Sequence, residues 1–528
     1  MSLDARGVDG SESRGHAVVI GSGLAGLTAA RALANFMDHV TVIERDRLPR
    51  GAARRRGVPQ ARHTHSLTTT AQQGLEQLFP GIGEDFERAG AVRVRLPQDA
   101  LVLGPAGWLP RFDAGLSMLS ASRDLIDAVI RERLRAEPKV SFLQGHEVLG
   151  LQPDRNDTVT GVWTRRRERP GPDGPGPRRL LSADFVVDAS GRDSRAPHWL
   201  AELGYEPPRE TVVRARTTYA STVFAPPIGH VADWQSLLLM AAPDTPRQGT
   251  LNVIEGGRWA VTLAFADGER PPTDHAGLLR AASRLRHPLL RDVIEHATPL
   301  GPVYACTHTE NRWRHYEKLR RWPDQFLVVG DALAVMDPAH GQGMTLAVQG
   351  ALVLDHMLSG HGTTVGLAYR LRRALAHRLA PAWQSSTRHL RTTGAQDTAG
   401  APGSAGLADG GRDRPRGLRA WLARRVTARI AAEAATEPHA AARLLARLQA
   451  AGPLAAVPRP RAAARPAAPA VPAPPPSITH GSRARRRHRT PAPAAPAIGV
   501  ATGSARLRPP GSSAQWPAPA PAGERRRP

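Results

Sequence analysis

The chain has 528 residues, which is enough for two or three cooperating domains. Its net charge of +24 is concentrated near the end, where residues 401–528 hold 22 Lys and Arg against 5 Asp and Glu, so the charge of the preceding residues does not indicate a polyanionic partner. The single cysteine, Cys306, excludes an internal disulfide and a cysteine-rich metal site, and we expect no bound metal.

The sequence indicates a cytoplasmic protein. The first 15 residues are polar and of mixed charge, without the basic, apolar and small-residue order of a signal peptide. No uninterrupted apolar run approaches the roughly 18–20 residues that a membrane-spanning helix needs. The longest candidate, residues 16–37, is interrupted by three glycines and by Thr28, Arg31 and Asn35. A peripheral membrane contact is left open.

A strand, a glycine-rich turn and a helix are predicted first. His16–Ile20 is a short apolar run typical of a buried parallel strand, and Leu24–Phe36 has helical spacing and small residues. The sequence GSGLAG between them matches the pattern GxGxxG. In this context Gly21 permits the tight turn, Gly23 lets the backbone approach a diphosphate, and Gly26 lets the helix lie close to the strand. The pattern predicts a dinucleotide whose phosphates lie at the helix N-terminus.

An acidic residue ends the second predicted strand, Val40–Ile43. Glu44 follows Gly26 by 18 residues, the spacing at which a carboxylate accepts hydrogen bonds from ribose hydroxyls. The basic segment Arg45–Arg62 contains Pro and Gly and is predicted as a loop, with Arg45 and Arg62 as candidates for cofactor contacts.

Further elements are predicted from periodicity and turn residues. Helices are expected at 65–78 and 122–135, and the second begins beside Arg123, whose guanidinium suits a phosphate. Residues 210–265 alternate apolar and polar positions, which predicts a mostly antiparallel sheet. Other strands are expected at 139–143, 148–151, 158–164, 183–189 and 325–330, and a further helix at 343–357.

Two later segments resemble motifs of flavoprotein monooxygenases. The sequence DASGRDSR, Asp188–Arg195, resembles the DG motif, which implies that Asp188 and Gly191 lie near the diphosphate. The sequence GDALAVMDPAHGQGM, Gly330–Met344, resembles the GD motif. The second resemblance implies that Asp331 accepts from ribityl hydroxyls and that a helix beginning near Gly343 favours negative charge on the reduced flavin. The other flavin-side residues that it implies are Pro338, His340, Gly341 and Met344.

The order of these motifs over residues 16–360 is similar to that of flavoproteins with the para-hydroxybenzoate-hydroxylase fold. The sequence GVPQARHTHSL, Gly57–Leu67, resembles a signature of actinobacterial polyether epoxidase-like enzymes and, more distantly, of squalene epoxidase. The resemblance implies an FAD-dependent monooxygenase of secondary metabolism that inserts oxygen from O2 through a C4a-hydroperoxyflavin. NADPH or NADH would supply electrons, directly or through a separate reductase.

The expected fold is α/β, with a Rossmann-like FAD-binding domain, an inserted antiparallel substrate domain, C-terminal helices and a disordered tail. The expected substrate is a lipophilic, polyketide- or isoprenoid-like small molecule that undergoes epoxidation or hydroxylation over the antiparallel sheet. The expected segments are 14–204 and 306–392 for FAD binding, 205–305 for substrate, 393–415 as a linker, 416–457 as helices and 458–528 as the tail.

Several residues keep two interpretations. His63 and His65 are either flavin-side or structural, and Asp337 and His340 are candidates for proton delivery or substrate contact. The aromatic residues of the sheet are either core or substrate lining: Tyr219, Trp234, Trp259 and Phe265. No protein nucleophile is required, because the flavin performs the oxygen chemistry in such enzymes.

Three rival functions remain. A flavin-dependent halogenase would need a Trp-x-Trp-x-Ile-Pro segment, which this sequence lacks. An isoprenoid reductase shares the nucleotide fingerprints but consumes no oxygen. A nucleic-acid-binding protein is ranked lowest, because the basic run Arg483–Arg489 has no interleaved aromatic residues and lies in a proline-rich stretch, residues 451–528, that holds 18 of the 48 prolines.

Overall fold

The structure is a computed structural model that describes residues 15–167, 176–214, 217–242, 244–266, 268–307, 309–338, 341–362, 364–392 and 428–449. All of them fall within one compact unit, Met1–Thr479. His340, the predicted linker 393–415 and the predicted tail 458–528 lie outside the described residues, as do 416–427 and 450–457 of the predicted helical segment.

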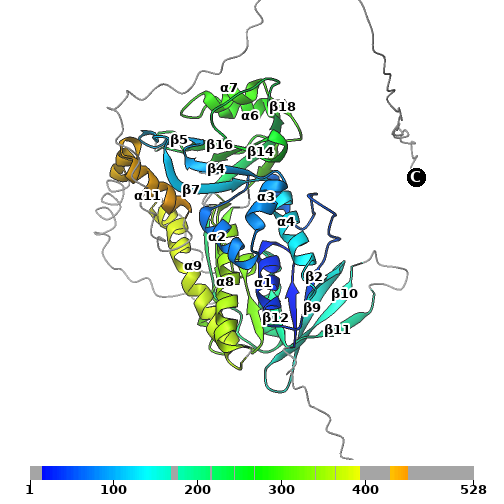
Figure 1. Cartoon of the computed structure of the whole chain (residues 1–528). Helices are drawn as coiled ribbons and strands as arrows, with labels where there is room; N and C mark the ends of the chain where they lie inside the picture. The colour runs from blue at the N-terminus through cyan, green and yellow to red at the C-terminus, as the bar shows by residue number, and fades with distance from the viewer. Residues whose placement is uncertain are drawn as a thin grey trace, which may run out of the picture. The chain divides into compact units, whose positions relative to one another are not determined.

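A five-stranded parallel sheet forms the nucleotide-binding part, with strand order β21-β12-β1-β2-β8. Four of its strands, β21, β12, β1 and β2, are short apolar runs buried along most of their length, as expected for a parallel sheet covered on both faces, and the edge strand β8 is partly buried. Helices α1 and α8 pack on each other beside this sheet (Figure 1). The strand bounds are β1 His16–Ile20, β2 His39–Glu44, β8 Val140–Gln144, β12 Phe185–Asp188 and β21 Phe326–Val328.

The register of this sheet brings the predicted motifs to one edge. Ile20 at the end of β1 pairs with Asp188 on one side and Ile43 on the other, and Asp188 pairs with Val328. Because the strands are parallel, the GSGLAG turn, the DASGR segment and the GDA segment all leave the carboxyl edge of the sheet. Ligands of open α/β sheets bind at this edge.

The second part is built on an eight-stranded, mostly antiparallel sheet of order β18-β14-β17-β16-β15-β5-β6, with β19 also paired to β14. Alternate residues of β14 and β17 form a hydrophobic core with helices α6 and α7. The bounds are β5 Ala100–Gly104, β6 Gly107–Trp108, β14 Thr218–Ala225, β15 Ser236–Leu239, β16 Arg247–Val253, β17 Trp259–Phe265, β18 Thr298–Pro299 and β19 Tyr304–Cys306.

Three small sheets complete the described strands, with orders β3-β7-β4, β11-β10-β9 and β13-β20-β22. Their bounds are β3 Ser66–Leu67, β4 Val92–Pro97, β7 Asp113–Ser120, β9 His146–Pro153, β10 Val159–Arg166, β11 Arg178–Ser182, β13 Glu210–Arg214, β20 Glu310–Arg314 and β22 Ala334–Val335.

The helices connect and cover these sheets (Figure 1). The last described helix, α11, packs its alanines and Leu445 against β4 and β7. The Gln449 side chain at its end accepts hydrogen bonds from the Thr69 backbone and hydroxyl, at the start of α2. The bounds are α1 Leu24–Ala34, α2 Thr69–Leu78, α3 Ile82–Arg88, α4 Arg123–Arg135, α5 Ala196–Glu202, α6 His275–Ala282, α7 Leu289–Glu295, α8 Gly343–His361, α9 Leu367–Thr392 and α11 Pro438–Gln449.

The predicted fold class is confirmed, and details differ. The helix expected at 65–78 begins only at Thr69, because Ser66 and Leu67 pair with β7 as a short strand. Strand β5, which precedes the predicted substrate segment, joins the eight-stranded sheet beside β15. The domain boundaries themselves stay predictions. None of the described helices is long and apolar enough to cross a membrane.

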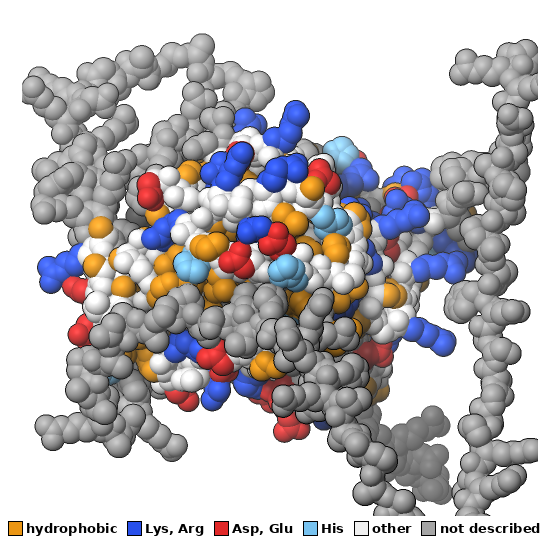
Figure 2. Space-filling model, turned by 90° about the horizontal axis from the view of Figure 1, so that it is seen from above, with side chains coloured by type: hydrophobic (Ala, Val, Ile, Leu, Met, Phe, Trp, Pro, Cys, Tyr) orange, Lys and Arg blue, Asp and Glu red, His pale blue; other side chains and the backbone are white. Residues whose placement is uncertain are grey.

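One face of the second part carries mixed charge. On the face in Figure 2, basic side chains are interspersed with acidic and hydrophobic ones. Such a mixture does not form the single-sign stripe that typifies a nucleic-acid interface.

Candidate dinucleotide and flavin site

The three glycines of the first turn differ in what surrounds them. Gly21 has a φ of +98°, and a Cβ there would lie 2.7 Å from the Ala189 carbonyl oxygen. A Cβ on Gly26 would lie 1.9 Å from the Gly21 carbonyl oxygen, whereas a Cβ on Gly23 would have no neighbour within 4 Å. Gly21 and Gly26 therefore serve the close contact of strand, turn and helix, and Gly23 faces open space.

The N-terminus of α1 is free of side-chain capping. The helix begins at Leu24 with Gly23 as its N-cap, and no side chain accepts a hydrogen bond from its first turn. The backbone N–H groups of this turn and the positive end of the helix dipole therefore remain for an anion.

Glu44 lies against the same turn. One carboxylate oxygen accepts a hydrogen bond from the Ser22 backbone at 3.0 Å and one from the Ser22 hydroxyl at 2.5 Å. The other oxygen accepts from the Asp46 backbone at 3.0 Å. The predicted ribose acceptor is thus buried where β2 meets the GSGLAG turn.

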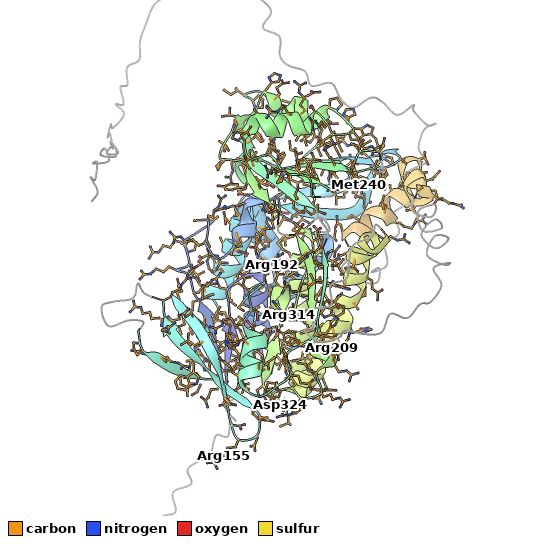
Figure 3. The ribbon with its side chains drawn as sticks, turned by 180° about the vertical axis from the view of Figure 1, so that it is seen from behind. Arg155, Arg192, Arg209, Met240, Arg314 and Asp324 are labelled. Carbon is orange, nitrogen blue, oxygen red and sulfur yellow. The ribbon has the colours of Figure 1, made fainter. Side chains whose placement is uncertain are left out.

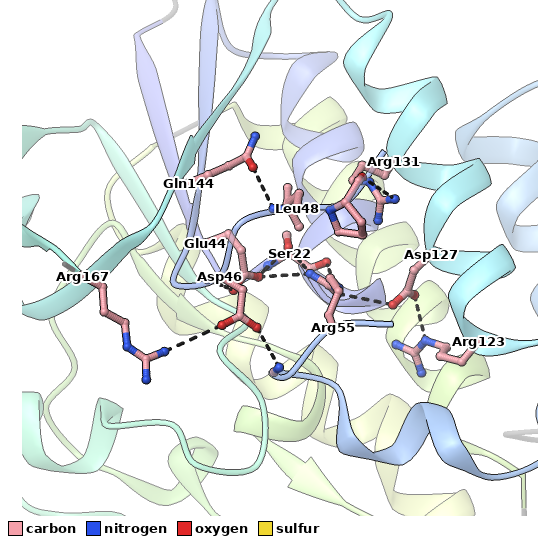
Figure 4. Close-up of polar contacts among 12 residues, drawn as sticks. Ser22, Glu44, Asp46, Leu48, Arg55, Arg123, Asp127, Arg131, Gln144 and Arg167 are labelled. Atoms are coloured by element: carbon pink, nitrogen blue, oxygen red, sulfur yellow. Dashed lines mark hydrogen bonds and ion pairs between the residues drawn. The ribbon is translucent and has the colours of Figure 1, made fainter. Parts of the chain in front are cut away.

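A buried network of four charges extends from Glu44 (Figure 4). The Arg55 guanidinium contacts Glu44 at 3.4 Å and Asp127 at 3.3 Å, and it donates to the Ser22 hydroxyl at 2.7 Å. Asp127 accepts from Arg123 at 2.8 Å through its other oxygen. Two cations and two carboxylates thus alternate beside the turn, and each arginine contacts at least one carboxylate.

Arg55 and Asp127 were not singled out in the sequence. Arg55 is one of several arginines in the segment 45–62, but it is buried, whereas Arg45 and Arg62 are exposed. The loop is held by hydrogen bonds from Arg131 to the carbonyl oxygens of Pro49 and Gly51. Arg62 lies over the Tyr304 ring at 4.6 Å, so it contacts the antiparallel sheet.

The DASGR segment is closed by Asp188. Its carboxylate accepts hydrogen bonds from the Ser190 backbone at 2.9 Å and the Ser194 hydroxyl at 2.5 Å. Burial raises the pKa of Asp188, and the hydrogen bonds oppose this rise. The carboxylate therefore shapes the loop that presents Gly191, where a Cβ would meet nothing within 4 Å.

Arg314 joins the two later motifs, and its role was also missed. Its guanidinium donates to the carbonyl oxygen of Arg192 at 3.0 Å and to that of Ala332 at 2.9 Å. The Arg314 side chain, labelled in Figure 3, is buried and also pairs with Glu210. Only the folded chain reveals this contact, because Arg314 lies 122 residues from Arg192.

The GD segment places Asp331 beside the fingerprint network. Burial raises the pKa of Asp331, and the positive charges of Arg123 and Arg192 lower it. A small cavity of about 40 Å³ is lined in part by Gly330, Asp331 and Gly343. The positive charge of Arg123, at the start of α4, therefore acts on the carboxylate of the GD segment.

The N-terminus of α8 is likewise open. The helix begins at Gly343 with no side-chain cap, and a Cβ on Gly341 or Gly343 would meet nothing within 4 Å. Pro338 is exposed and Met344 partly buried. The backbone at these two glycines is therefore open to a ligand on the side where a Cβ would point.

The loop before Pro338 is tied to the antiparallel sheet. The Tyr219 hydroxyl on β14 donates a hydrogen bond to the buried Asp337 carboxylate. The Asp337 backbone donates to the Asn311 side chain at 3.0 Å. Of the four aromatic candidates, Tyr219 alone makes this contact, whereas Trp234, Trp259 and Phe265 lie in the core against α6 and α7.

The two histidines of the GVPQARHTHSL segment face different surroundings. His63 shares a 2.8 Å hydrogen bond with the Ser221 hydroxyl of β14, and His65 shares one of 2.7 Å with the His63 carbonyl oxygen. Burial, with the nearby Arg123 as a second cause, lowers the pKa of His65 to about 3. His65 is therefore neutral at physiological pH. Among the described residues, no group of His, Cys, Asp and Glu side chains is suited to hold a metal ion.

These features fit FAD. The open Cβ position of Gly23 and the uncapped α1 suit a diphosphate, and Glu44 suits the adenosine ribose. We propose that Asp331 and Arg123 contact the part of FAD between the diphosphate and the flavin ring, and that the ring lies at the open corner of Gly341 and Gly343. His340 lies outside the described residues, and the contacts of all these residues with FAD remain our proposal.

The comparisons with known proteins agree with the fold. The family described as "FAD binding domain" matches residues 15–388. The chain is 33% identical to the protein Rv3254 of Mycobacterium tuberculosis over 375 residues, covering 70% of this chain and 78% of that protein. It is 26% identical to kynurenine 3-monooxygenase of Salinispora tropica, also over 375 residues, covering 66% and 73%.

Solved structures with low identity share the fold. PqsL of Pseudomonas aeruginosa, described as a probable FAD-dependent monooxygenase, has a TM-score of 0.51 at 19% identity and covers 71% of this chain and 94% of its own. The myxobacterial halogenase CndH has a TM-score of 0.54 at 18% identity, with coverages of 82% and 95%.

The fold and the matched family define the class, an FAD-binding flavoprotein with the para-hydroxybenzoate-hydroxylase fold. The chain belongs to the FAD binding domain family and is an FAD-dependent oxidoreductase of the monooxygenase family.

Proposed function

We propose that this enzyme inserts one oxygen atom from O2 into a lipophilic small molecule by epoxidation or hydroxylation. The observation that carries the proposal is the hydrogen bond between Tyr219 and Asp337. It ties the sheet on which a substrate would lie to the loop that would hold the flavin ring. The epoxidase subfamily is supported by the GVPQARHTHSL resemblance, and NADPH or NADH is the proposed electron source.

Each group of residues at the site has a proposed role. Gly23 and the α1 N-terminus bind the diphosphate, while Arg55 and Arg123 balance its charge. Asp331 holds the ribityl chain, and the backbone at Gly341 and Gly343 orients the ring. Bound FAD supplies the oxygen-transfer chemistry after reduction. The residues of this chain position the substrate, and the sheet and the loop 59–65 exclude water.

A spectrum and an isotope experiment test this function. Purified protein should be yellow, release FAD on denaturation, and consume O2 in a nicotinamide-dependent reaction that a lipophilic substrate accelerates. With labelled O2, one labelled oxygen atom should appear in the product. Colourless protein that does not take up added FAD would refute the cofactor assignment, and saturation of a double bond without oxygen uptake would identify a reductase.

The same assay separates a halogenase, which shares the fold. Addition of bromide or chloride should leave the product unchanged if the proposal holds. A halogenated product that depends on the halide would replace oxygen insertion with the rival function.

A further inference from the structure

The eight-stranded sheet has two faces: one packs against α6 and α7, and the opposite face carries polar side chains that are not part of this hydrophobic core. Along β17, Trp259, Val261, Leu263 and Phe265 belong to the hydrophobic core with α6 and α7. Because side chains alternate along a strand, Thr262 and Ala264 lie on the other face. Both are partly exposed to solvent.

Cross-strand pairing extends this face over β16. Thr250 lies opposite Thr262, and Gln248 lies opposite Ala264. Directly opposite residues of antiparallel strands share a face, so Thr250 and Gln248 point the same way as Thr262. Thr262 in turn lies opposite Ser221, and Ala264 opposite Tyr219.

This face looks toward the proposed flavin corner. The Thr64 and Thr262 hydroxyls are 2.8 Å apart, and Tyr219 donates to Asp337, the residue before Pro338. Neighbouring strands are about 4.8 Å apart, so Gln248 lies on the order of 10 Å from Tyr219 across the sheet. A substrate of about that length would reach from the flavin corner to β16.

The hydroxyls nearest the corner already have protein partners. Ser221 and Thr262 share a hydrogen bond of 2.7 Å, and Ser221 also bonds to His63. Thr250 and Gln248 are different, because their side chains make no hydrogen bond to any other part of the chain that the structure describes. Each is partly exposed, so each can donate to and accept from a ligand.

Apolar side chains border these two residues. Leu238 on β15 lies opposite Thr250, and Ala264 lies opposite Gln248. Met240, just beyond β15, and Leu238 are partly buried against the core that contains α11 (Figure 3). A mostly apolar surface with two unused polar groups suits an apolar molecule with one polar substituent.

We propose that Thr250 and Gln248 bind a carbonyl or hydroxyl oxygen of an otherwise apolar substrate and thereby set which carbon faces the flavin. This inference rests on the proposed function and defines its substrate class. Both residues are positioning residues, because they contact the substrate away from the reacting atoms. An unmodified hydrocarbon would leave both polar groups without a partner and would bind more weakly.

Matched probes test the proposal on the FAD-loaded enzyme. The probes are 2-naphthol with naphthalene and farnesol with farnesene, and the readout is the change in the flavin absorption spectrum on titration. The wild-type enzyme should bind the oxygenated member of a pair about tenfold more tightly. The double variant Gln248→Leu, Thr250→Val should lose that preference and still bind the hydrocarbon.

Two control variants keep the result specific. Thr298→Val changes an exposed threonine on edge strand β18 of the same sheet and should retain the preference. Thr250→Ser with Gln248 intact should retain it as well, because the hydroxyl remains. FAD content and the melting temperature of each variant show whether it is folded.

Three outcomes would overturn the proposal: equal binding within each pair, a preference that survives the double substitution, or a wild-type enzyme that binds none of the four probes. Failure of the proposed function is distinct from these outcomes. It would appear as protein without FAD or without nicotinamide-dependent oxygen uptake, before any probe is compared.

Discussion

Tyr219 and Asp337 lie 118 residues apart in the chain and are joined by a hydrogen bond between the two parts of the molecule. One residue belongs to the antiparallel sheet and the other to the loop that precedes Pro338. The position of the sheet over the proposed flavin corner therefore depends in part on one phenolic hydroxyl.

Tyr219→Phe should lower the rate of the oxygen-transfer step and leave FAD content unchanged. The ring still fills its place, but Asp337 loses a donor, which costs about 1 kcal/mol and loosens the loop. We expect kcat to fall about tenfold, measured by substrate-dependent oxygen uptake with stoichiometric FAD. Tyr369→Phe, on the exposed side of α9, is the matched control, and an equal loss in both variants would contradict the assignment.

Gly23→Val and Gly26→Val should fail in different ways. The valine at 23 meets open space in the folded chain, so the variant should fold and lose FAD binding by at least 100-fold, because the side chain occupies the diphosphate site. The valine at 26 collides with the Gly21 carbonyl oxygen, so that variant should be unstable. Flavin fluorescence titration and thermal unfolding separate the two effects. Full FAD content in folded Gly23→Val would refute the placement of the diphosphate.

Asp127→Asn should weaken FAD binding about tenfold, because the Asp127 carboxylate contacts Arg55 with one oxygen and Arg123 with the other. Loss of its charge leaves Arg55 with Glu44 alone and removes the carboxylate partner of Arg123 in this network, which should also lower the free energy of unfolding by about 3 kcal/mol. The dissociation constant for FAD, measured well below the melting temperature, tests this. Asp124→Asn, on the same helix, is the control and should change the dissociation constant little, because the ion pair of Asp124 is a 4.0 Å contact with the exposed Arg54.

His65 should make the folded state sensitive to acid. Its pKa is lowered to about 3 from 6.5 in the folded protein, so only the unfolded state binds the proton between these values, and stability falls as the pH drops below about 6.5. At pH 5 the loss should be about 2 kcal/mol relative to pH 7.5. His65→Gln should remove this loss, as measured by urea unfolding at both pH values. A variant with the same pH dependence as the wild type would contradict the prediction. The control is His198→Gln, which changes an exposed histidine on α5.

Removal of residues 458–528 should leave FAD content, stability and activity unchanged, because this segment rich in Ala, Pro and Arg is predicted not to contribute to the folded core. A chain that ends at residue 427 also loses α11 and should expose the apolar residues of β4 and β7 that α11 covers. We expect that shorter chain to aggregate or to melt at a clearly lower temperature. Loss of FAD in the chain that ends at 457 would show that the tail has a role in binding.

The nucleotide-binding half was largely predictable from the sequence because its signals are local. A buried strand, a glycine turn and a helix occupy consecutive residues, and Glu44 follows at a known spacing. Asp188 and Asp331 were found through the resemblance to the DG and GD motifs, each of which comes at or just after the end of an apolar strand. The structure shows in addition that the Asp188 carboxylate holds its own loop through hydrogen bonds from Ser190 and Ser194. The motif does not specify these contacts.

The missed residues act through contacts distant in the chain. Arg55 resembles the exposed arginines around it, and burial alone distinguishes it. Asp127 has the spacing of an ordinary helical partner of Arg123, and its second contact, with Arg55, arises only in the fold. The aromatic residues of the sheet illustrate the same limit. Alternation predicts two faces, but it does not tell which face meets α6 and α7 and which meets the flavin loop.

The position of α11 has a consequence for how the protein is made. Strands β4 and β7 leave the ribosome more than 300 residues before Leu445, which completes their hydrophobic cluster. During synthesis the apolar surface of β4 and β7 therefore stays exposed to solvent, or bound by a chaperone, until residue 445 has been translated. Incomplete chains that lack α11 should therefore aggregate. The yield of folded protein should be higher when expression is slow and at low temperature.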